Sequence, residues 1–170
     1  VTGFGMTSLM VAAERGFTTR DEACRRMQQI GTFLSGKATA YHGAYAHWIN
    51  GQTGATIPFS ANDNGADLVE TAYLFQGLLT ARAYFDATGA EQTLREGITR
   101  LWEAVEWDFF TKEGTAKALY WHWSPDKGWV MNLPVQGWNE SLTVYVRAAA
   151  SPTHPTACPL YPTDAPHERL

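Results

Sequence analysis

Three carboxylates stand close together at the start of the most apolar stretch of the chain, residues 63–85. Asp63, Asp67 and Glu70 occur there among leucine, valine and aromatic residues. A carboxylate is costly to bury unless a partner stabilises it or its chemistry requires it. Acidic side chains can carry general acid–base catalysis, because one group can donate a proton while another accepts one. These acids are therefore the first candidates for catalysis.

Helical periodicity places Glu70 on a distinctive face of the predicted helix. At about 100° per residue, Glu70 and Tyr73 fall in one sector with small and polar residues, and most leucines and phenylalanines avoid that sector. Such a face is typical of a cavity wall. Asp63 and Asp67 fall near the same side at the N-terminal end, where they could equally cap the helix. For Glu70 the alternative is a structural ion pair with an arginine.

The aromatic content predicts a ligand-binding surface. The chain has seven Trp, seven Tyr and eight Phe. The indole face is apolar while its N–H can donate a hydrogen bond, so tryptophans in loops favour stacking of flat, partly apolar ligands. The tryptophans predicted in or beside loops are Trp48, Trp121, Trp123, Trp129 and Trp138.

Other chemistry-bearing residues give weaker signals. His42, His47 and His122 match no metal-ligand spacing, so we expect no metal. The sequence has no nucleophile elbow, P-loop or dinucleotide-binding glycine turn, and we expect no cofactor. Glu140 follows Asn139, a predicted helix cap, so it could either complement the helix dipole or bind substrate.

Overall composition excludes several kinds of partner. The 170 residues carry a net charge of −4 and no run of Lys or Arg, which argues against nucleic acid. The apolar stretches are broken by polar residues before the roughly 20 residues that a membrane span needs, so no membrane partner is expected. With 45% hydrophobic residues the chain can form one domain with a core. Cys24 and Cys158 indicate neither a disulfide framework nor a compartment.

The helices expected from the pattern alternate in character. Three are apolar nearly all round, at residues 3–14, 64–86 and 140–150; two are amphipathic, at residues 20–34 and 91–106. Thr19 with Glu22 forms a capping-box signature before the second helix. Because a helix apolar on every side must be covered on every side, the alternation predicts an inner and an outer layer. We therefore expect an all-α fold that forms part of a double-layered α/α toroid.

Two long loops interrupt the helices. Residues 37–62 contain an Asn-Gly hairpin signal and residues 114–137 contain the turn sequence PDKG. Each loop leads from an outer helix into an inner one, so both should lie at the same end of the toroid, with short β-hairpins over its mouth. From Ser151 onward there are five prolines in twenty residues. We therefore divide the chain into a domain, residues 1–150, and an extended tail, residues 151–170.

Long motifs in this order resemble a known family. They include HGAYAHWINGQTGATIPFS, NDNGADLVETAYLFQGLLTARAYF, LYWHWSPDKGW and GWNES. Together they resemble the glycoamylase-like domain family, which is similar to bacterial endo-β-1,2-glucanases and to a domain of cyclic β-1,2-glucan synthases. The resemblance implies an (α/α)6 toroid, a glycoside hydrolase site and a periplasmic or extracellular location. It also implies further helices before residue 1, since six helical hairpins need about twelve helices.

The resemblance also implies roles for individual residues. Glu70 takes the position of the general acid, and its apolar neighbours favour the neutral form of a carboxyl group. Asp67 is the first candidate for a catalytic partner, with Asp63 and Glu140 as alternatives or as ligands of sugar hydroxyls. The remaining predicted substrate-binding residues are His42, Trp48, Tyr73, Trp121, His122, Trp129 and Trp138. The alternatives to hydrolysis are transglycosylation on the same glucan and carbohydrate binding without turnover.

Overall fold

A computed structural model describes residues 2–137 and 142–156, which form a helix-rich structure. Its five α-helices are α1 (Thr2–Glu14), α2 (Arg20–Gly36), α3 (Leu68–Tyr84), α4 (Ala90–Glu103) and α5 (Leu142–Ala150). A short 3-10 helix, η1 (Trp107–Thr111), follows α4. The helices expected from the sequence are all present. However, the third begins at Leu68 rather than near residue 64, because the Asp67 side chain caps it there.

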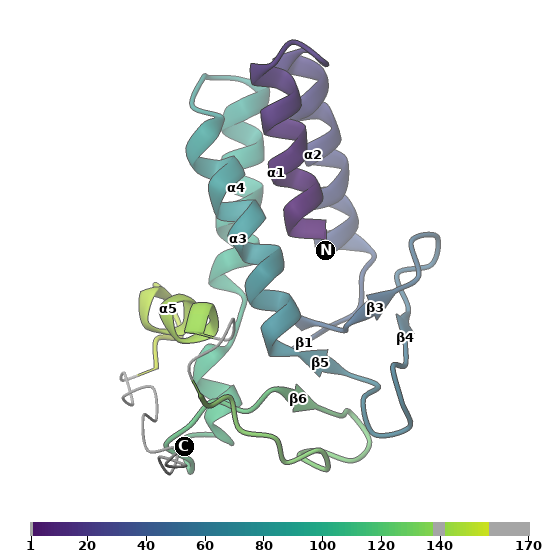
Figure 1. The fold of residues 1–170 in the computed structure, drawn as a ribbon, viewed down its shortest axis with the longest axis vertical. Coiled ribbons are helices and arrows are strands. Elements are labelled where there is room, and N and C mark those ends of the chain that lie inside the picture. Colours follow the sequence, from purple (N-terminus) through teal and green to yellow (C-terminus); the bar gives the residue numbers. More distant parts are fainter. Residues whose placement is uncertain (1, 138–141, 157–170) are drawn as a thin grey trace, which may run out of the picture.

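The helices α1 to α4 pack side by side, and the loops lie beyond one end of them (Figure 1). α3 contacts α1, α4 and α5, and α2 contacts α1 and α4. Nine of the seventeen residues of α3 are buried, more than in any other described helix, as predicted for an inner helix. α2 and α4 each bury only one face, as predicted for outer helices.

α1 is less covered than its sequence predicted. Its buried residues are Gly3, Met6 and Met10, whereas Phe4 and Val11 are 63% and 54% exposed. The reason is that α1 packs on α3 and α2 along one side only. The remaining apolar side of α1 is exposed in the part of the chain that the structure describes.

The crossing of α1 and α3 depends on two glycines. A Cβ atom added at Gly77 would come within 2.6 Å of Gly3 Cα, and one added at Gly3 would come within 3.0 Å of the Tyr73 carbonyl carbon. The two backbones can approach this closely only because neither residue carries a side chain. The crossing therefore fixes the position of α3 through its backbone.

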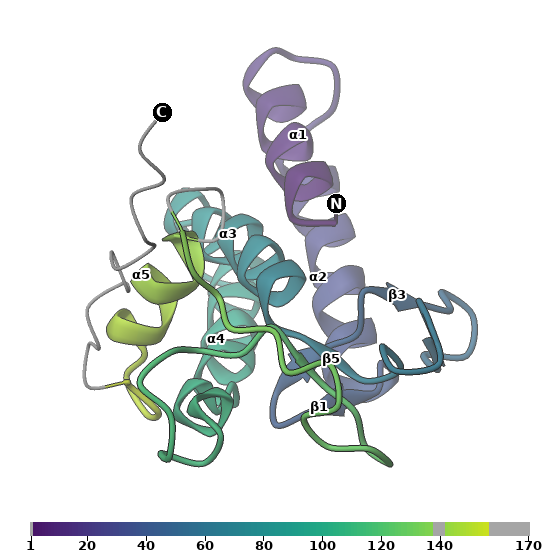
Figure 2. The ribbon, with the colours of Figure 1, turned by 60° about the horizontal axis from the view of Figure 1, so that its bottom comes forward.

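Three pairs of two-residue strands lie at the loop end. They are β1 (Ala40–Tyr41) with β2 (Ala44–Tyr45), β3 (Trp48–Ile49) with β4 (Thr56–Ile57), and β5 (Ala66–Asp67) with β6 (His122–Trp123), all antiparallel. The first two pairs are hairpins within the 37–62 loop, where the sequence predicted one. The β5–β6 pair joins the start of α3 to the 114–137 loop (Figure 2). Both long loops therefore meet at the N-terminal end of α3, as predicted.

Two local predictions are confirmed in part. The Thr19 side chain accepts a hydrogen bond from the Glu22 N–H and so caps α2, but the Glu22 carboxylate pairs with Arg25 and Arg26 instead of completing the capping box. Residues 151–156, the described part of the predicted tail, contain no helix. They nevertheless fold back onto the domain, since Thr156 N–H donates to Ala148 O. No helix in the described residues is long and apolar enough to cross a membrane.

Candidate active site

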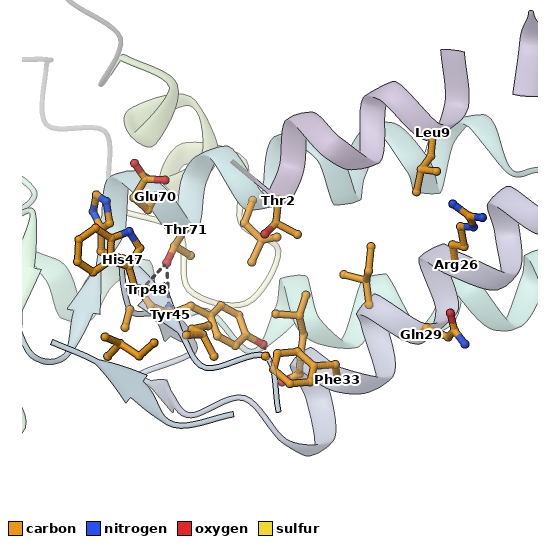
Figure 3. A pocket seen from close by; sticks show the side chains of 17 residues that line it. Thr2, Leu9, Arg26, Gln29, Phe33, Tyr45, His47, Trp48, Glu70 and Thr71 are labelled. Carbon is orange, nitrogen blue, oxygen red and sulfur yellow. Dashed lines mark hydrogen bonds between the residues drawn. The ribbon is translucent and has the colours of Figure 1, made fainter. Parts of the chain in front are cut away.

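A cavity of about 870 Å³ lies between the start of α3, the β3–β4 hairpin and one side of α1 and α2. Figure 3 shows Glu70, His47 and Trp48 together at one end, with Arg26 and Gln29 at the other. Trp48 lines the cavity and is half exposed, so part of its ring can contact a ligand. The cavity thus combines a carboxylate with an aromatic wall, which is the combination that the sequence predicted.

Glu70 is held in place through its backbone. It lies in the first turn of α3, where its N–H donates to Asp67 Oδ1 at 3.0 Å, and the N–H of Val69 donates to the same oxygen at 3.1 Å. These bonds satisfy two of the N–H groups that a helix start leaves without intrahelical partners. The orientation of Glu70 toward the cavity therefore depends on the Asp67 cap.

Asp67 is buried and makes several hydrogen bonds. Its residue is 1% exposed, and besides the two backbone N–H groups it interacts with Trp121 Nε1 at 2.9 Å and His47 Nδ1 at 3.2 Å. Burial raises the pKa of Asp67, while the N–H of Glu70 opposes this shift. The structure gives Asp67 the capping role that the sequence left open. Its side chain is not part of the cavity wall, and its catalytic role stays a prediction.

Asp63 and His122 complete a buried polar cluster behind the cap. His122 Nε2 lies 3.5 Å from Asp63 Oδ2 and 3.8 Å from Asp67 Oδ2. Among the described residues, these three side chains form the group that could hold a metal ion. Their possible ligand atoms all lie within 4.8 Å of one another. Yet both oxygens of Asp67 already interact with protein nitrogens. The set therefore fits a cation only in part, and the expectation of no metal stays a prediction.

Strand pairing brings the 114–137 loop to this cluster. His122 is paired with Asp67 in the β5–β6 ladder, and the Trp121 ring stacks on the His122 ring at 5.7 Å between centroids. The structure thus places Trp121 and His122 against Asp67 rather than in the cavity wall, and their substrate-binding role stays a prediction.

His42 and Trp129 lie in a separate aromatic cluster. The His42 ring stacks on Phe109 at 3.4 Å and its Nδ1 pairs with Glu106 Oε2 at 2.8 Å. Trp129 packs against the same phenylalanine at 5.3 Å. Neither residue lines the cavity, and their substrate-binding role stays a prediction.

The other predicted residues have mixed outcomes. Tyr73 is half-buried against Phe4 of α1, at 5.9 Å between ring centroids, and does not line the cavity. Trp138 and Glu140 lie outside the described residues. Of the predicted substrate-binding residues within the described ranges, Trp48 is the one that the structure places in the cavity wall.

Comparison with known proteins gives this geometry a context. No family model matches the chain. It is 44% identical over 162 residues to an exo β-1,2-glucooligosaccharide sophorohydrolase (non-reducing end) of Parabacteroides distasonis. It also superposes on the endo-β-1,2-glucanase from Chitinophaga pinensis, solved with sophorotriose and glucose, with a TM-score of 0.90 at 45% identity. Nearly the whole chain is thus similar in sequence and structure to a part of each of these two proteins.

The similarity covers nearly all of this chain but only part of each relative. A β-1,2-glucanase from Parabacteroides distasonis superposes with a TM-score of 0.91 at 44% identity. Each comparison covers 94% of the chain, but only 22% of the sophorohydrolase, 38% of the Chitinophaga enzyme and 23% of the Parabacteroides structure. The resemblance predicted from the sequence motifs is confirmed for the glucanases.

Sequence reasoning missed His47 as a residue of the candidate site. His47 lines the cavity beside Glu70 and contacts Asp67 from a different loop. The available signal was its position next to Trp48, the loop tryptophan that was assigned to substrate binding. Because the contact with Asp67 spans 20 residues of an irregular loop, spacing alone did not reveal it.

Proposed function

We propose that the chain is part of a glycoside hydrolase that cleaves a β-1,2-linked glucan by carboxylate acid–base catalysis. The observation that carries the proposal is Glu70, a carboxylate at the wall of a cavity beside the exposed face of Trp48. The high identity to enzymes named for β-1,2-glucan and its oligosaccharides supports the choice of substrate.

In this proposal Glu70 donates its proton to the glycosidic oxygen as the bond breaks. Trp48 stacks on a glucosyl ring, because the C–H face of a sugar is apolar and packs on an indole. The start of α3 supplies a fixed frame, since Asp67 holds the backbone of Glu70. Positioning of this kind contributes to catalysis by keeping the acid within reach of the leaving oxygen.

Glycoside hydrolysis also needs a second carboxylate on the other side of the bond, at about 5 Å from the acid in retaining enzymes and about 6.5–9.5 Å in inverting ones. Asp67, the cap of α3, and the neighbouring Asp63 are buried and do not line the cavity. Glu140, outside the described residues, keeps its predicted place as a candidate for this role.

Two broader expectations belong to the same proposal. The consecutive hairpins α1–α2 and α3–α4, with α3 buried and α2 and α4 each open on one face, are consistent with part of an (α/α)6 toroid. An enzyme of this kind would act on glucan outside the cytoplasm, in the periplasm or beyond the cell. Fractionation of cells that produce the full-length protein would test the location.

The decisive experiment measures reducing-end release by the full-length protein from soluble β-1,2-glucan, with α-1,4-glucan as the control substrate. Glu70→Gln should lower kcat by about 10²-fold or more, the range for loss of a general acid. Glu103→Gln, which changes an exposed glutamate of α4, should leave kcat unchanged. Unchanged activity in Glu70→Gln would reject the acid role. Transfer of glucosyl units to another sugar without net hydrolysis would identify a transglycosylase.

A further inference from the structure

His47 occupies an unusual position between a buried acid and the cavity. It lies between strands β2 and β3, its side chain is 31% exposed, and it lines the cavity next to Glu70 (Figure 3). One ring nitrogen, Nδ1, lies 3.2 Å from Asp67 Oδ2. One edge of the ring therefore contacts Asp67, the cap of α3, and the other edge faces the cavity.

The contact with Asp67 determines which nitrogen of the neutral ring carries the proton. Asp67 Oδ1 accepts hydrogen bonds from the N–H groups of Val69 and Glu70 and from the indole of Trp121, a pattern that favours the ionised carboxylate. An ionised carboxylate only accepts hydrogen bonds, so beside it we assign Nδ1 as the donor. In neutral imidazole the other nitrogen is then an acceptor. Nε2 of His47 makes no hydrogen bond to any residue in the described ranges, and it belongs to a side chain of the cavity wall. An acceptor is thus presented to whatever occupies the cavity.

Aromatic neighbours fix the plane of the ring. His47 lies 4.7 Å from the Phe59 ring and 5.4 Å, nearly perpendicular, from the Trp48 ring. Phe59 and Trp48 also contact each other at 4.9 Å, and both are about half exposed. A ring held by two neighbours and a carboxylate loses little further freedom when a ligand binds, which favours affinity.

We propose that His47 is a substrate-binding residue. Its Nε2 accepts a hydrogen bond from a hydroxyl group of the glucosyl unit that stacks on Trp48. This unit lies beside the glycosidic oxygen that Glu70 protonates. Asp67 acts as a positioning residue by holding the ring in the required tautomer. This inference rests on the proposed function and adds to it a polar contact that orients the sugar relative to the acid.

Two variants of His47 separate a substrate contact from a purely structural contact. In His47→Asn the amide nitrogen occupies the place of Nδ1, so the bond to Asp67 can remain while the group facing the cavity is lost. In His47→Gln the longer amide reaches the place of Nε2, so the cavity contact can remain while the bond to Asp67 is lost. The matched control is His154→Asn, because His154 also pairs through Nδ1 with an aspartate, Asp108, but lies outside the cavity wall.

The full-length variants would be assayed for kcat and KM on β-1,2-glucan, with sophorotriose binding followed by tryptophan fluorescence and folding followed by thermal melting. We expect His47→Asn to melt like the parent and to lose at least 10-fold in kcat/KM and in sophorotriose affinity. His47→Gln should retain more of both, and His154→Asn should match the parent.

The reverse order, with His47→Asn active and His47→Gln impaired, would show that His47 acts only through Asp67 and would overturn the inference. Parent-like kcat/KM in both variants would also overturn it, while the proposed function would stand. A parent protein that neither cleaves β-1,2-glucan nor binds sophorotriose would overturn the proposed function and the inference together.

Discussion

The indole nitrogen of Trp121 donates a hydrogen bond to Asp67 Oδ1 at 2.9 Å. The bond joins the 114–137 loop to the cap of α3, and the same oxygen receives the N–H of Glu70. The loop and the candidate acid thus share one acceptor atom. A change in the loop can therefore alter the position of Glu70 without touching it.

Trp121→Phe tests this link. Phenylalanine preserves a ring that can stack on His122 but removes the N–H donor. Because the lost bond is to a charged acceptor, we expect the free energy of unfolding to fall by about 1.5–3 kcal/mol, with a decrease in kcat. Urea unfolding and glucan hydrolysis measure the two effects. Trp123→Phe is the control for ring size, since its indole makes no hydrogen bond to another described residue; equal losses in the two variants would contradict the link.

The glycine crossing of α1 and α3 gives a second prediction. Gly77→Ala should lower the free energy of unfolding by about 1–3 kcal/mol, because the new Cβ would force the two backbones apart. Gly5→Ala on α1 should instead raise it by up to about 1 kcal/mol, since a Cβ there meets nothing within 4 Å and alanine favours the helix. Chemical denaturation compares them, and a loss at both positions of similar size would reject a specific role for the crossing.

The Arg20–Glu91 pair gives a prediction about pH. Arg20 Nε and Nη2 donate to the two oxygens of Glu91 at 2.6 and 2.9 Å, and this pairing lowers the pKa of Glu91 from 4.5 to about 2. A lowered pKa in the folded state means that the stabilisation is present above pH 4.5 and is lost as pH falls toward 2.

We therefore expect Glu91→Gln to cost about 1–2 kcal/mol at pH 7, a value reduced by the partial exposure of Arg20. The difference from the parent should shrink between pH 4.5 and pH 2. Urea unfolding at several pH values, followed by tryptophan fluorescence, measures it. A difference that stayed constant down to pH 2 would show that the charge of Glu91 is not its source.

Metal removal tests the buried Asp63–Asp67–His122 cluster. A cation there would have to compete for Asp67 oxygens that already interact with the indole, imidazole and backbone nitrogens around them. We therefore expect dialysis against EDTA to leave glucan hydrolysis by the full-length protein unchanged. Loss of activity that a divalent cation restores would instead identify the cluster as a metal site.

The sequence predicted the helices well because their signals are local. Periodicity separated the buried α3 from the amphipathic α2 and α4, and Asn50-Gly51 marked a hairpin. The site was harder to predict. Asp67 has the same sequence signature as a cap and as a catalytic acid, and the sequence does not show that Asp67 is buried against Trp121.

Two histidines show the same limit of prediction from the sequence. His42 and His47 are five residues apart in one loop, yet one stacks on Phe109 and the other lies in the cavity wall. That difference depends on which distant segment each ring meets, namely Phe109 for His42 and Asp67 for His47. Spacing along the chain does not show which distant residues each ring contacts, so the sequence did not predict that His47 lines the cavity and His42 does not.

The strand pair β5–β6 also has a consequence for the order in which the protein folds. Trp121 and Asp67 are 54 residues apart in sequence, whereas the hairpins α1–α2 and α3–α4 form from neighbours in the chain. Contacts between distant residues form slowly because a long segment must first be closed. We therefore expect the hydrogen bond from Trp121 to Asp67 to form late in folding, after the helices. In the native protein we expect the amide hydrogens of this two-residue ladder to exchange faster than those of the helices, because so short a ladder can open locally.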